Sequence, residues 1–328
     1  MKRLFCIVVA LVLLVSGFAF ADYEEKLGVG ALLVTTSTDM EDGSVMGFEG
    51  QPSDEIAWIA LCEYANNYIE GIDRLDYTKQ ELDSIYSLLF AGGALSEDPP
   101  ECSFERLETG EYRFYPGDSN ATRIAAINRE TRNSDGSVDY DASIYSVMHV
   151  DGDERFIQNL TAVVEPDERS AFGGRVRSMN ITETSAFAPN SASATAELKP
   201  ASGNTYVAGN AIDGKPETCW SYDGKKDADA TMTLTFDEPT DLRGIVFTPG
   251  YAKSEDAFKN NRRIKELEVN IGTKYISMPV GEDMSFEMLV VIPFGEVLEG
   301  VTDIGVRVIE TYPGEKYDDV CISEISFF

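Results

Sequence analysis

The segment AIDGKPETCW, residues 211–220, is the most informative part of this 328-residue sequence for the fold of its C-terminal region. Its Asp213-Gly214 pair predicts a tight turn, because Gly adopts backbone angles that other residues avoid. After the turn, we expect Thr218 and Trp220 to return the chain into a β-structure in which Trp220 is buried. The segment therefore predicts a turn that leads into a buried strand of an all-β domain.

Short runs of alternating apolar residues follow this corner, as in Met232, Leu234 and Phe236. A period of two is typical of strands that bury one face. Gly and Pro between the runs predict turns, and no stretch after about Ser191 is convincing as a helix. We predict a β-sandwich with strands at Thr231–Phe236, Gly244–Thr248, Ile264–Ile271, Phe286–Ile292, Ile304–Glu310 and Val320–Phe327.

Three further motifs accompany the turn: GYAK at residues 250–253, NNRRIK at 260–265 and YDDVCISEI at 317–325. Together the four stretches resemble the discoidin-like, galactose-binding-like domains, and within them the subgroup called the NADase-type glycan-binding domain. The resemblance covers about Ser191 to Phe328 and implies a jelly-roll β-sandwich. The subgroup is named after a toxin in which it is an accessory module, so the resemblance does not imply NAD-cleaving activity.

Many discoidin-like modules hold a structural Ca²⁺ at this turn, so the resemblance implies a calcium site here. Its side-chain ligands would be Asp213, Thr218 and Glu324, and the carbonyls of Asn210 and Lys215 could complete the shell. Carboxylate, hydroxyl and carbonyl oxygens are the hard ligands that Ca²⁺ prefers. The alternative is that Asp213 only caps its turn and Glu324 hydrogen-bonds the backbone. Apart from Ca²⁺, we expect no cofactor.

The loops Tyr251–Arg263 and Tyr312–Asp319 form the candidate ligand-binding region. Sugar recognition needs a flat aromatic face and polar groups that bond pairs of hydroxyls. The candidate ligand residues are Tyr251, Lys253, Asn261, Arg262, Tyr312, Lys316 and Asp318, with Phe258, Tyr317 and Asn260 offering further faces and polar groups. The basic residues of the first loop could also receive an anionic sugar. The alternative is that Asn261 and Arg262 brace the loop and pair with local acids.

The N-terminal part predicts helices followed by strands. Ser53 and Thr78 are candidate helix caps, and Glu81 completes a capping box with Thr78. Strands with a period of two then follow at Tyr112–Tyr115, Thr122–Arg132, Ser137–Val150, Arg155–Val164 and Arg175–Ile181. Polar turns at Asn133–Gly136 and Asp151–Asp153 indicate an antiparallel meander. We expect an α+β domain, for which a cystatin-like or nuclear-transport-factor-like cone is an analogy of fold only.

A composition shift near Thr184 separates two predicted domains. The α+β domain covers residues 22–183, a linker rich in small residues covers 184–190, and the β-sandwich covers 191–328. Residues 1–21 match a signal peptide, with a basic start, a short apolar run and Ala19-Phe20-Ala21. That run is short for a membrane span. We therefore expect cleavage near Ala21 and export to the periplasm or beyond the cell.

The charge balance excludes several kinds of partner. The sequence has 57 Asp and Glu against 27 Lys and Arg, a formal net charge of −30. Such a chain repels phosphate, so sequence-independent binding of nucleic acid is nearly excluded. The single histidine, His149, leaves no basis for a His-dependent triad or a multi-His metal site.

Four cysteines remain after the signal peptide: Cys62, Cys102, Cys219 and Cys321. An even number in an exported protein predicts two disulfides, and three pairings exist. We favour Cys62–Cys102 and Cys219–Cys321, because each pair then closes within one predicted domain. Free buried thiols and a metal site are the alternatives, although no Cys-x-x-Cys occurs.

No catalytic motif occurs, whether G-x-S-x-G, a Walker loop or H-E-x-x-H. The sequence therefore favours an exported, non-enzymatic binding protein that recognises a glycan or a cell-surface or envelope component, with a protein partner left open. One alternative is a secreted enzyme or toxin whose active site in the N-terminal domain follows no known motif. The other is a structural envelope protein.

Overall fold

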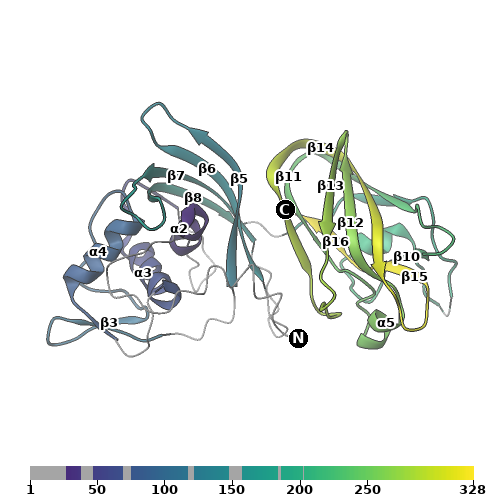
Figure 1. Cartoon of the computed structure of the whole chain (residues 1–328), viewed down its shortest axis with the longest axis horizontal. Coiled ribbons are helices and arrows are strands. Elements are labelled where there is room, and N and C mark those ends of the chain that lie inside the picture. Colours follow the sequence, from purple (N-terminus) through teal and green to yellow (C-terminus); the bar gives the residue numbers. More distant parts are fainter. Residues whose placement is uncertain are drawn as a thin grey trace. The chain divides into compact units, whose positions relative to one another are not determined.

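The helix that the sequence places after Ser53 is present as α3 (Asp54–Tyr68), with the Ser53 hydroxyl accepting the Ile56 N–H at 3.2 Å. Figure 1 shows a computed structural model of the chain. The structure describes residues 27–37, 47–68, 75–116, 122–147, 157–183, 186–201 and 203–328. The described residues between 27 and 144 and at 158–183 form an N-terminal unit, and the described residues at 145–147, at 157 and from 186 onward form a C-terminal unit. Every helix within the described ranges is too short or too polar to span a bilayer.

A further helix, α2 (Gly28–Thr36), lies in a segment to which the sequence analysis assigned no element. Glycine and β-branched residues make up most of it, and both lower helix propensity. Leu32 and Leu33 are nevertheless fully buried, and Gly30 lies close to Ala125 of the neighbouring sheet. Tertiary burial therefore stabilises α2, which is why the local sequence did not reveal it.

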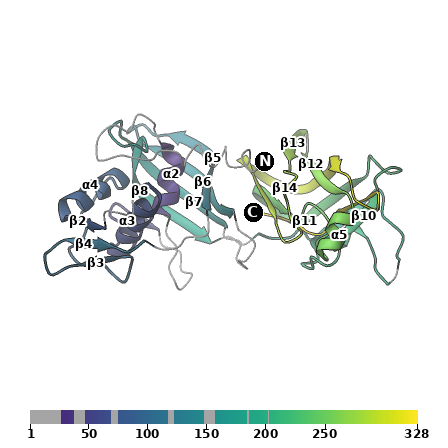
Figure 2. The same ribbon diagram turned by 60° about the horizontal axis from the view of Figure 1, so that its bottom comes forward.

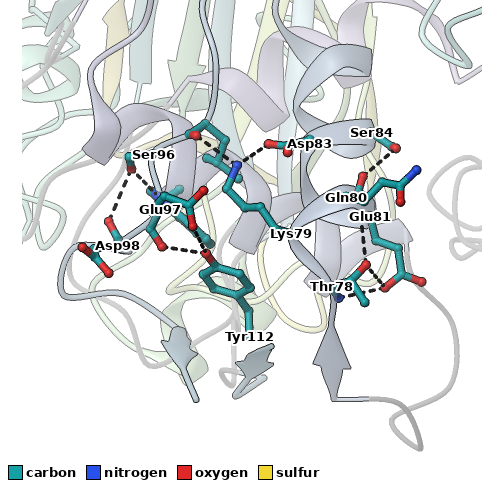
Figure 3. Close-up of polar contacts among 12 residues, drawn as sticks. Thr78, Lys79, Gln80, Glu81, Asp83, Ser84, Ser96, Glu97, Asp98 and Tyr112 are labelled. Carbon is teal, nitrogen blue, oxygen red and sulfur yellow. Dashed lines mark hydrogen bonds and ion pairs between the residues drawn. The ribbon is translucent and has the colours of Figure 1, made fainter. Parts of the chain in front are cut away.

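The second predicted helix is α4 (Lys79–Leu89), and it begins with the expected capping box. The Thr78 hydroxyl accepts the Glu81 N–H at 3.3 Å, and the Glu81 carboxylate accepts the Thr78 N–H at 2.9 Å (Figure 3). The two bonds satisfy amide groups that a helix start leaves without partners. This prediction is confirmed.

The loop after α4 is tied back to the helix and to a small sheet. Lys79 Nζ donates to the Leu95 carbonyl at 3.0 Å, and the Tyr112 hydroxyl donates to the Glu97 carbonyl at 2.7 Å (Figure 3). Tyr112 belongs to β4 (Tyr112–Phe114), which lies between β2 (Asp76–Tyr77) and β3 (Phe104–Arg106). The sequence analysis placed this strand at the start of the meander, and that placement is wrong. Its partner β2 comes from before α4, whereas β3 forms a hairpin with β4 around Gly110 that the sequence-based assignment missed.

The predicted meander forms a five-stranded antiparallel sheet in the order β1-β8-β7-β6-β5. Its strands are β1 (Phe48–Glu49), β5 (Thr122–Arg132), β6 (Val138–Val147), β7 (Ile157–Pro166) and β8 (Gly174–Glu183). The turn at residues 133–136 is confirmed, and Gly136 takes a φ of 89° there. The turn predicted at 151–153 lies outside the described residues. The α+β class is therefore confirmed for this unit.

The two faces of this sheet differ sharply in polarity. Leu160, Ala162 and Val164 of β7 are buried on the face that packs with α2 and the other helices (Figure 2). The residues between them, such as Thr161, point to the opposite face, because neighbouring side chains of a strand alternate. On that opposite face Thr161 pairs with Asn180 of β8. One face of the sheet therefore forms the core of the unit and the other is polar.

The C-terminal unit is a β-sandwich. Its larger sheet has the order β13-β12-β14-β11-β16, and β9 also pairs with β11. The second sheet is the pair β10–β15. The strands are β9 (Ser191–Ala194), β10 (Trp220–Asp223), β11 (Thr231–Phe247), β12 (Arg263–Ile271), β13 (Lys274–Pro279), β14 (Val290–Tyr312), β15 (Asp319–Ile322) and β16 (Ile325–Phe327). Trp220 is fully buried between the sheets, as predicted.

Several elements of this unit differ from the sequence-based assignment. The strands predicted at 231–236 and 244–248 are parts of one strand, β11, which crosses bulges where its register with β14 shifts. A short helix, α5 (Glu255–Asn260), and a 3₁₀ turn, η1 (Ala208–Ile212), occur where no helix was predicted, and β13 was missed. Bulges depend on the register with a partner strand, and helices of one or two turns are too short to show an apolar period, so apolar periodicity does not predict them.

Candidate functional site

The predicted oxygen cluster assembles at the turn of residues 213–218. The Thr218 hydroxyl lies 2.9 Å from Asp213 Oδ1, 2.9 Å from the Lys215 carbonyl and 3.4 Å from the Asn210 carbonyl. From the far end of the chain, Glu324 accepts the Gly214 N–H at 3.3 Å. All five residues predicted from the resemblance therefore meet at one place, and Gly214 takes the positive φ of 74° expected of this turn.

The negative charges of the two carboxylates in this cluster, Asp213 and Glu324, repel each other. Burial, and then the neighbouring charge of Asp213, raise the pKa of Glu324 to about 7 against two backbone N–H groups that lower it. Glu324 Oε1 is buried and has no hydrogen-bond partner. A buried, unpaired carboxylate oxygen is costly unless a cation or proton compensates it. With two carboxylates, two carbonyls and a hydroxyl as its donors, the cluster suits a hard cation such as Ca²⁺.

The candidate ligand residues fall into three groups: buried rings, side chains that brace the loops, and exposed residues. Tyr251 is only 8% exposed, enclosed with Tyr206, Ala257, Cys219 and Cys321. The expectation that Tyr251 offers its ring to a ligand therefore needs correction, and so does that for Phe258, which is 3% exposed. Tyr251 packs with Cys321 of β15, and Phe258 lies against Gly250 and Arg263, so both rings support the loop rather than face solvent.

Loop residues Asn261 and Arg262 act as braces, the alternative that the sequence left open. Asn261 is buried and its amide donates to the Ala257 carbonyl at 2.7 Å. Arg262 donates from Nη2 to Asp318 at 2.9 Å and from Nη1 to the Thr311 hydroxyl at 3.1 Å. A guanidinium with two such partners connects the two loops that the sequence singled out.

Tyr312 also serves the structure. Its hydroxyl donates to the Val280 carbonyl at 2.8 Å. The Arg263 guanidinium lies 5.4 Å from the Tyr312 ring centre and 5.6 Å from that of Phe258. Arg263 thus bridges two rings through cation–π contacts. The sequence showed Arg263 only as one member of a basic cluster, and only the tertiary structure reveals this contact.

Lys316 and Tyr317 are exposed and Asp318 is partly exposed, and these three consecutive residues form the Tyr317 patch. Lys253 is exposed on the other loop. Tyr317 is 44% exposed, and the Lys316 ammonium lies 5.0 Å from the centre of its ring. Asp318 forms ion pairs with Lys225 at 2.5 Å and with Arg262, and hydrogen bonds from these two groups lower its pKa. This Tyr317 patch therefore presents an aromatic ring beside a carboxylate that is already fixed in place.

One strand end links the oxygen cluster to the loop that carries Lys253. Ser323, next to Glu324, accepts the Ala252 N–H on its hydroxyl at 2.9 Å and donates its own N–H to the Gly250 carbonyl at 3.1 Å. The backbone before Lys253 is thus fixed to the residue beside the candidate cation ligand.

The cysteines lie in the pairs that the sequence favoured. Cys62 hydrogen-bonds Cys102 in the N-terminal unit, and Cys219 hydrogen-bonds Cys321 in the C-terminal unit. All four are free thiols in this structure. The disulfides therefore stay a prediction.

A groove of about 730 Å³ crosses the five-stranded sheet of the N-terminal unit. Its lining includes residues of the polar face, such as Thr161 and Asn180. Charged groups also line it, namely Glu49, Arg129, Asp139 and Asp141. Asp141 accepts a hydrogen bond from the Asn128 amide at 3.1 Å. The sequence analysis named none of these residues, because acids are too frequent in this chain for two of them to stand out.

Residues 184–328 match the family described as the NAD glycohydrolase translocation F5/8 type C domain. The C-terminal unit is therefore a discoidin-like domain, as its motifs indicated. No curated protein matches the chain.

Several solved structures are similar to the C-terminal part of the chain. The Clostridium perfringens domain CpGH89CBM32-5, in complex with GalNAc-beta-1,3-galactose, is 21% identical, and the match covers 42% of this chain and 94% of that one with a TM-score of 0.31. The family 32 module of C. perfringens NanJ, in complex with galactose, is 19% identical over 42% of this chain and 91% of that one, with a TM-score of 0.29. The family 32 carbohydrate-binding module of Streptococcus pneumoniae EndoD is 12% identical over 44% and 99%, with a TM-score of 0.33.

Proposed function

We propose that this protein is exported and binds a glycan or a cell-surface or envelope component through its C-terminal unit, without catalysing a reaction. The observation that supports this function most directly is the Tyr317 patch, an exposed ring beside a fixed carboxylate. It lies on a loop of a discoidin-like sandwich.

The chemistry of the patch suits a sugar. The Tyr317 ring offers an apolar face for the C–H side of a pyranose, and Asp318 offers acceptor oxygens for hydroxyl groups. Arg262 and Lys225 hold Asp318 before any ligand arrives, so little side-chain entropy is lost on binding. Lys253 and Lys316 are exposed and could attract an anionic substituent to a strongly acidic protein.

We also propose that the turn at residues 213–218 and Glu324 hold Ca²⁺ in a structural role. Asp213 and Glu324 would supply carboxylate oxygens, Thr218 its hydroxyl, and Asn210 and Lys215 their carbonyls. A bound cation would neutralise the opposed carboxylates. Through Ser323 it would also steady the backbone that leads to Lys253.

The experiment for the glycan proposal compares two exposed tyrosines. Tyr317→Ala should weaken binding on a glycan array by roughly tenfold, about 1–2 kcal/mol, because the stacking face is lost. Tyr275→Ala is the matched control, since Tyr275 is 64% exposed on β13, outside the patch. Equal binding by both variants, or no glycan bound by the intact protein, would contradict the proposal.

A second candidate function is an enzyme whose active site lies in the N-terminal unit, and the polar groove is the observation that favours it. Asp139 and Asp141 are acids that could transfer protons, with Arg129 able to orient an anionic substrate. Because the family that matches residues 184–328 is described by an NAD glycohydrolase, NAD is the first substrate to test. Release of nicotinamide by the wild type but not by Asp139→Asn or Asp141→Asn would establish this function. Absence of turnover would support the binding protein.

A further inference from the structure

Two pairs of cysteines meet in this structure, one in each unit, and each pair joins segments that lie far apart in the sequence. Cys62 is on α3, whereas Cys102 lies in the loop before β3. Cys219 directly precedes β10, and Cys321 is on β15, the antiparallel partner of β10. In both pairs the two thiols hydrogen-bond each other.

We propose that Cys62–Cys102 and Cys219–Cys321 are the two disulfides of the functional protein, and that they form by different routes. In each pair two thiols lose two protons and two electrons. A small-molecule disulfide such as oxidised glutathione takes the electrons and is reduced to two thiols. The inference is independent of ligand binding by the Tyr317 patch.

The Cys62–Cys102 pair is open to an oxidant in the folded protein. Cys102 is partly exposed, whereas Cys62 is 7% exposed. The hydrogen bond from Cys62 lowers the pKa of Cys102 to about 7, and its thiolate also accepts the Phe104 N–H at 3.4 Å. The thiolate is the nucleophile in thiol–disulfide exchange, so Cys102 attacks first.

The exchange then proceeds in two balanced steps. Cys102 forms a mixed disulfide with one half of the oxidant and releases the other half as a thiolate. Cys62 loses its proton to solvent and attacks the Cys102 sulfur, which forms the protein disulfide and releases the second thiolate. The hydrogen bond between the thiols already places the second nucleophile beside its target.

The Cys219–Cys321 pair is closed to an oxidant in the folded protein. Cys219 is fully buried and Cys321 is 2% exposed, and Tyr251 packs against both. This disulfide must therefore form before the C-terminal unit closes, or during its opening. Once formed, it would join the strand ends that carry Thr218 and Glu324, so it would hold the oxygen cluster together.

Peptide mapping under non-reducing conditions tests the connectivity. The full chain carrying Cys6→Ser, so that only these four cysteines remain, is unfolded, reduced and refolded with oxidised and reduced glutathione. We expect linked peptides for Cys62–Cys102 and Cys219–Cys321, and no thiol that an alkylating reagent can modify after denaturation. Any other connectivity, or alkylation of all four cysteines, would overturn the proposal.

A second arm of the experiment tests the two routes. The same chain is refolded fully reduced, and oxidised glutathione is added only afterwards. We expect Cys62–Cys102 to form at least tenfold faster than Cys219–Cys321, which should require mild denaturant. Equal rates of formation for the two disulfides would refute the proposed difference in their access to the oxidant. The pair variants Cys62→Ala/Cys102→Ala and Cys219→Ala/Cys321→Ala each leave one disulfide to be followed alone. If either variant fails to fold, the peptide map of the Cys6→Ser chain still decides the connectivity.

Discussion

At the residue scale, Arg262 is the side chain whose role changed most between sequence and structure. It joins the loop after α5 to Asp318 and Thr311, and its own N–H donates to the Asp319 carbonyl at 2.9 Å. Gly224 leaves room for this contact, because a Cβ there would lie 2.8 Å from the Asp318 carbonyl. Arg262 thus holds Asp318 of the Tyr317 patch in place.

Replacing Arg262 should therefore destabilise the C-terminal unit. Arg262→Met keeps much of the aliphatic stem but removes the hydrogen bonds, and we expect a loss of about 1–3 kcal/mol in the free energy of unfolding. Urea unfolding in a Trp58→Phe background isolates this unit, because Trp220 is then the only tryptophan. Lys259→Met, in an exposed helical ion pair with Glu255, should change stability by less than about 0.5 kcal/mol. An effect of Arg262→Met no larger than this control would show that the brace is unimportant.

At the element scale, the turn at residues 213–218 depends on the last strand of the chain. Asp213 and Thr218 close the turn locally, but Glu324 comes from the segment between β15 and β16. Without a cation, the raised pKa of Glu324 means that this group supports folding below pH 4.5, its ordinary pKa. That support is lost as the pH rises through about 7.

Calcium should therefore stabilise the protein, and more strongly at higher pH. At a hundredfold excess over its Kd, Ca²⁺ should add about 2.7 kcal/mol, or on the order of 5 °C in Tm. The shift should shrink below pH 7, because protons compete for Glu324. Differential scanning calorimetry with CaCl₂ and with EGTA measures it. Glu324→Gln should abolish the shift, whereas Glu299→Gln, an exposed acid on β14, should keep it. A Tm that is the same in CaCl₂ and EGTA would rule the cation site out.

At the scale of the whole molecule, the chain combines a strongly acidic composition with two units of different architecture. Its net charge of −30 favours solubility and repels other polyanions. The exposed Lys316 of the Tyr317 patch places a positive charge on this acidic chain. The proposed export would place both proposals in one setting, since glycans and disulfides both occur outside the cytoplasm. N-terminal sequencing of the exported protein should begin at Asp22, and an intact Met1 would contradict cleavage.

Local chemistry explains which features could be predicted from the sequence alone. The capping box at Thr78, the turns at residues 133–136 and 213–214, and the burial of Trp220 all depend on neighbours within a few residues. Alternating apolar residues likewise indicate strands that bury one face. These patterns, with the discoidin-like motifs, determined the α+β and jelly-roll classes.

Only the tertiary structure decided which loop residues face solvent. Tyr251 and Tyr317 look alike in sequence, yet one is 8% exposed and the other 44%. The difference arises because Cys219, Cys321 and Tyr206 arrive from distant segments to enclose Tyr251. The helix α2, the pairing of β4 with β2 and the sheet groove were hidden for the same reason. Each results from packing between segments far apart in the chain, and a local pattern contains no information about its distant partners.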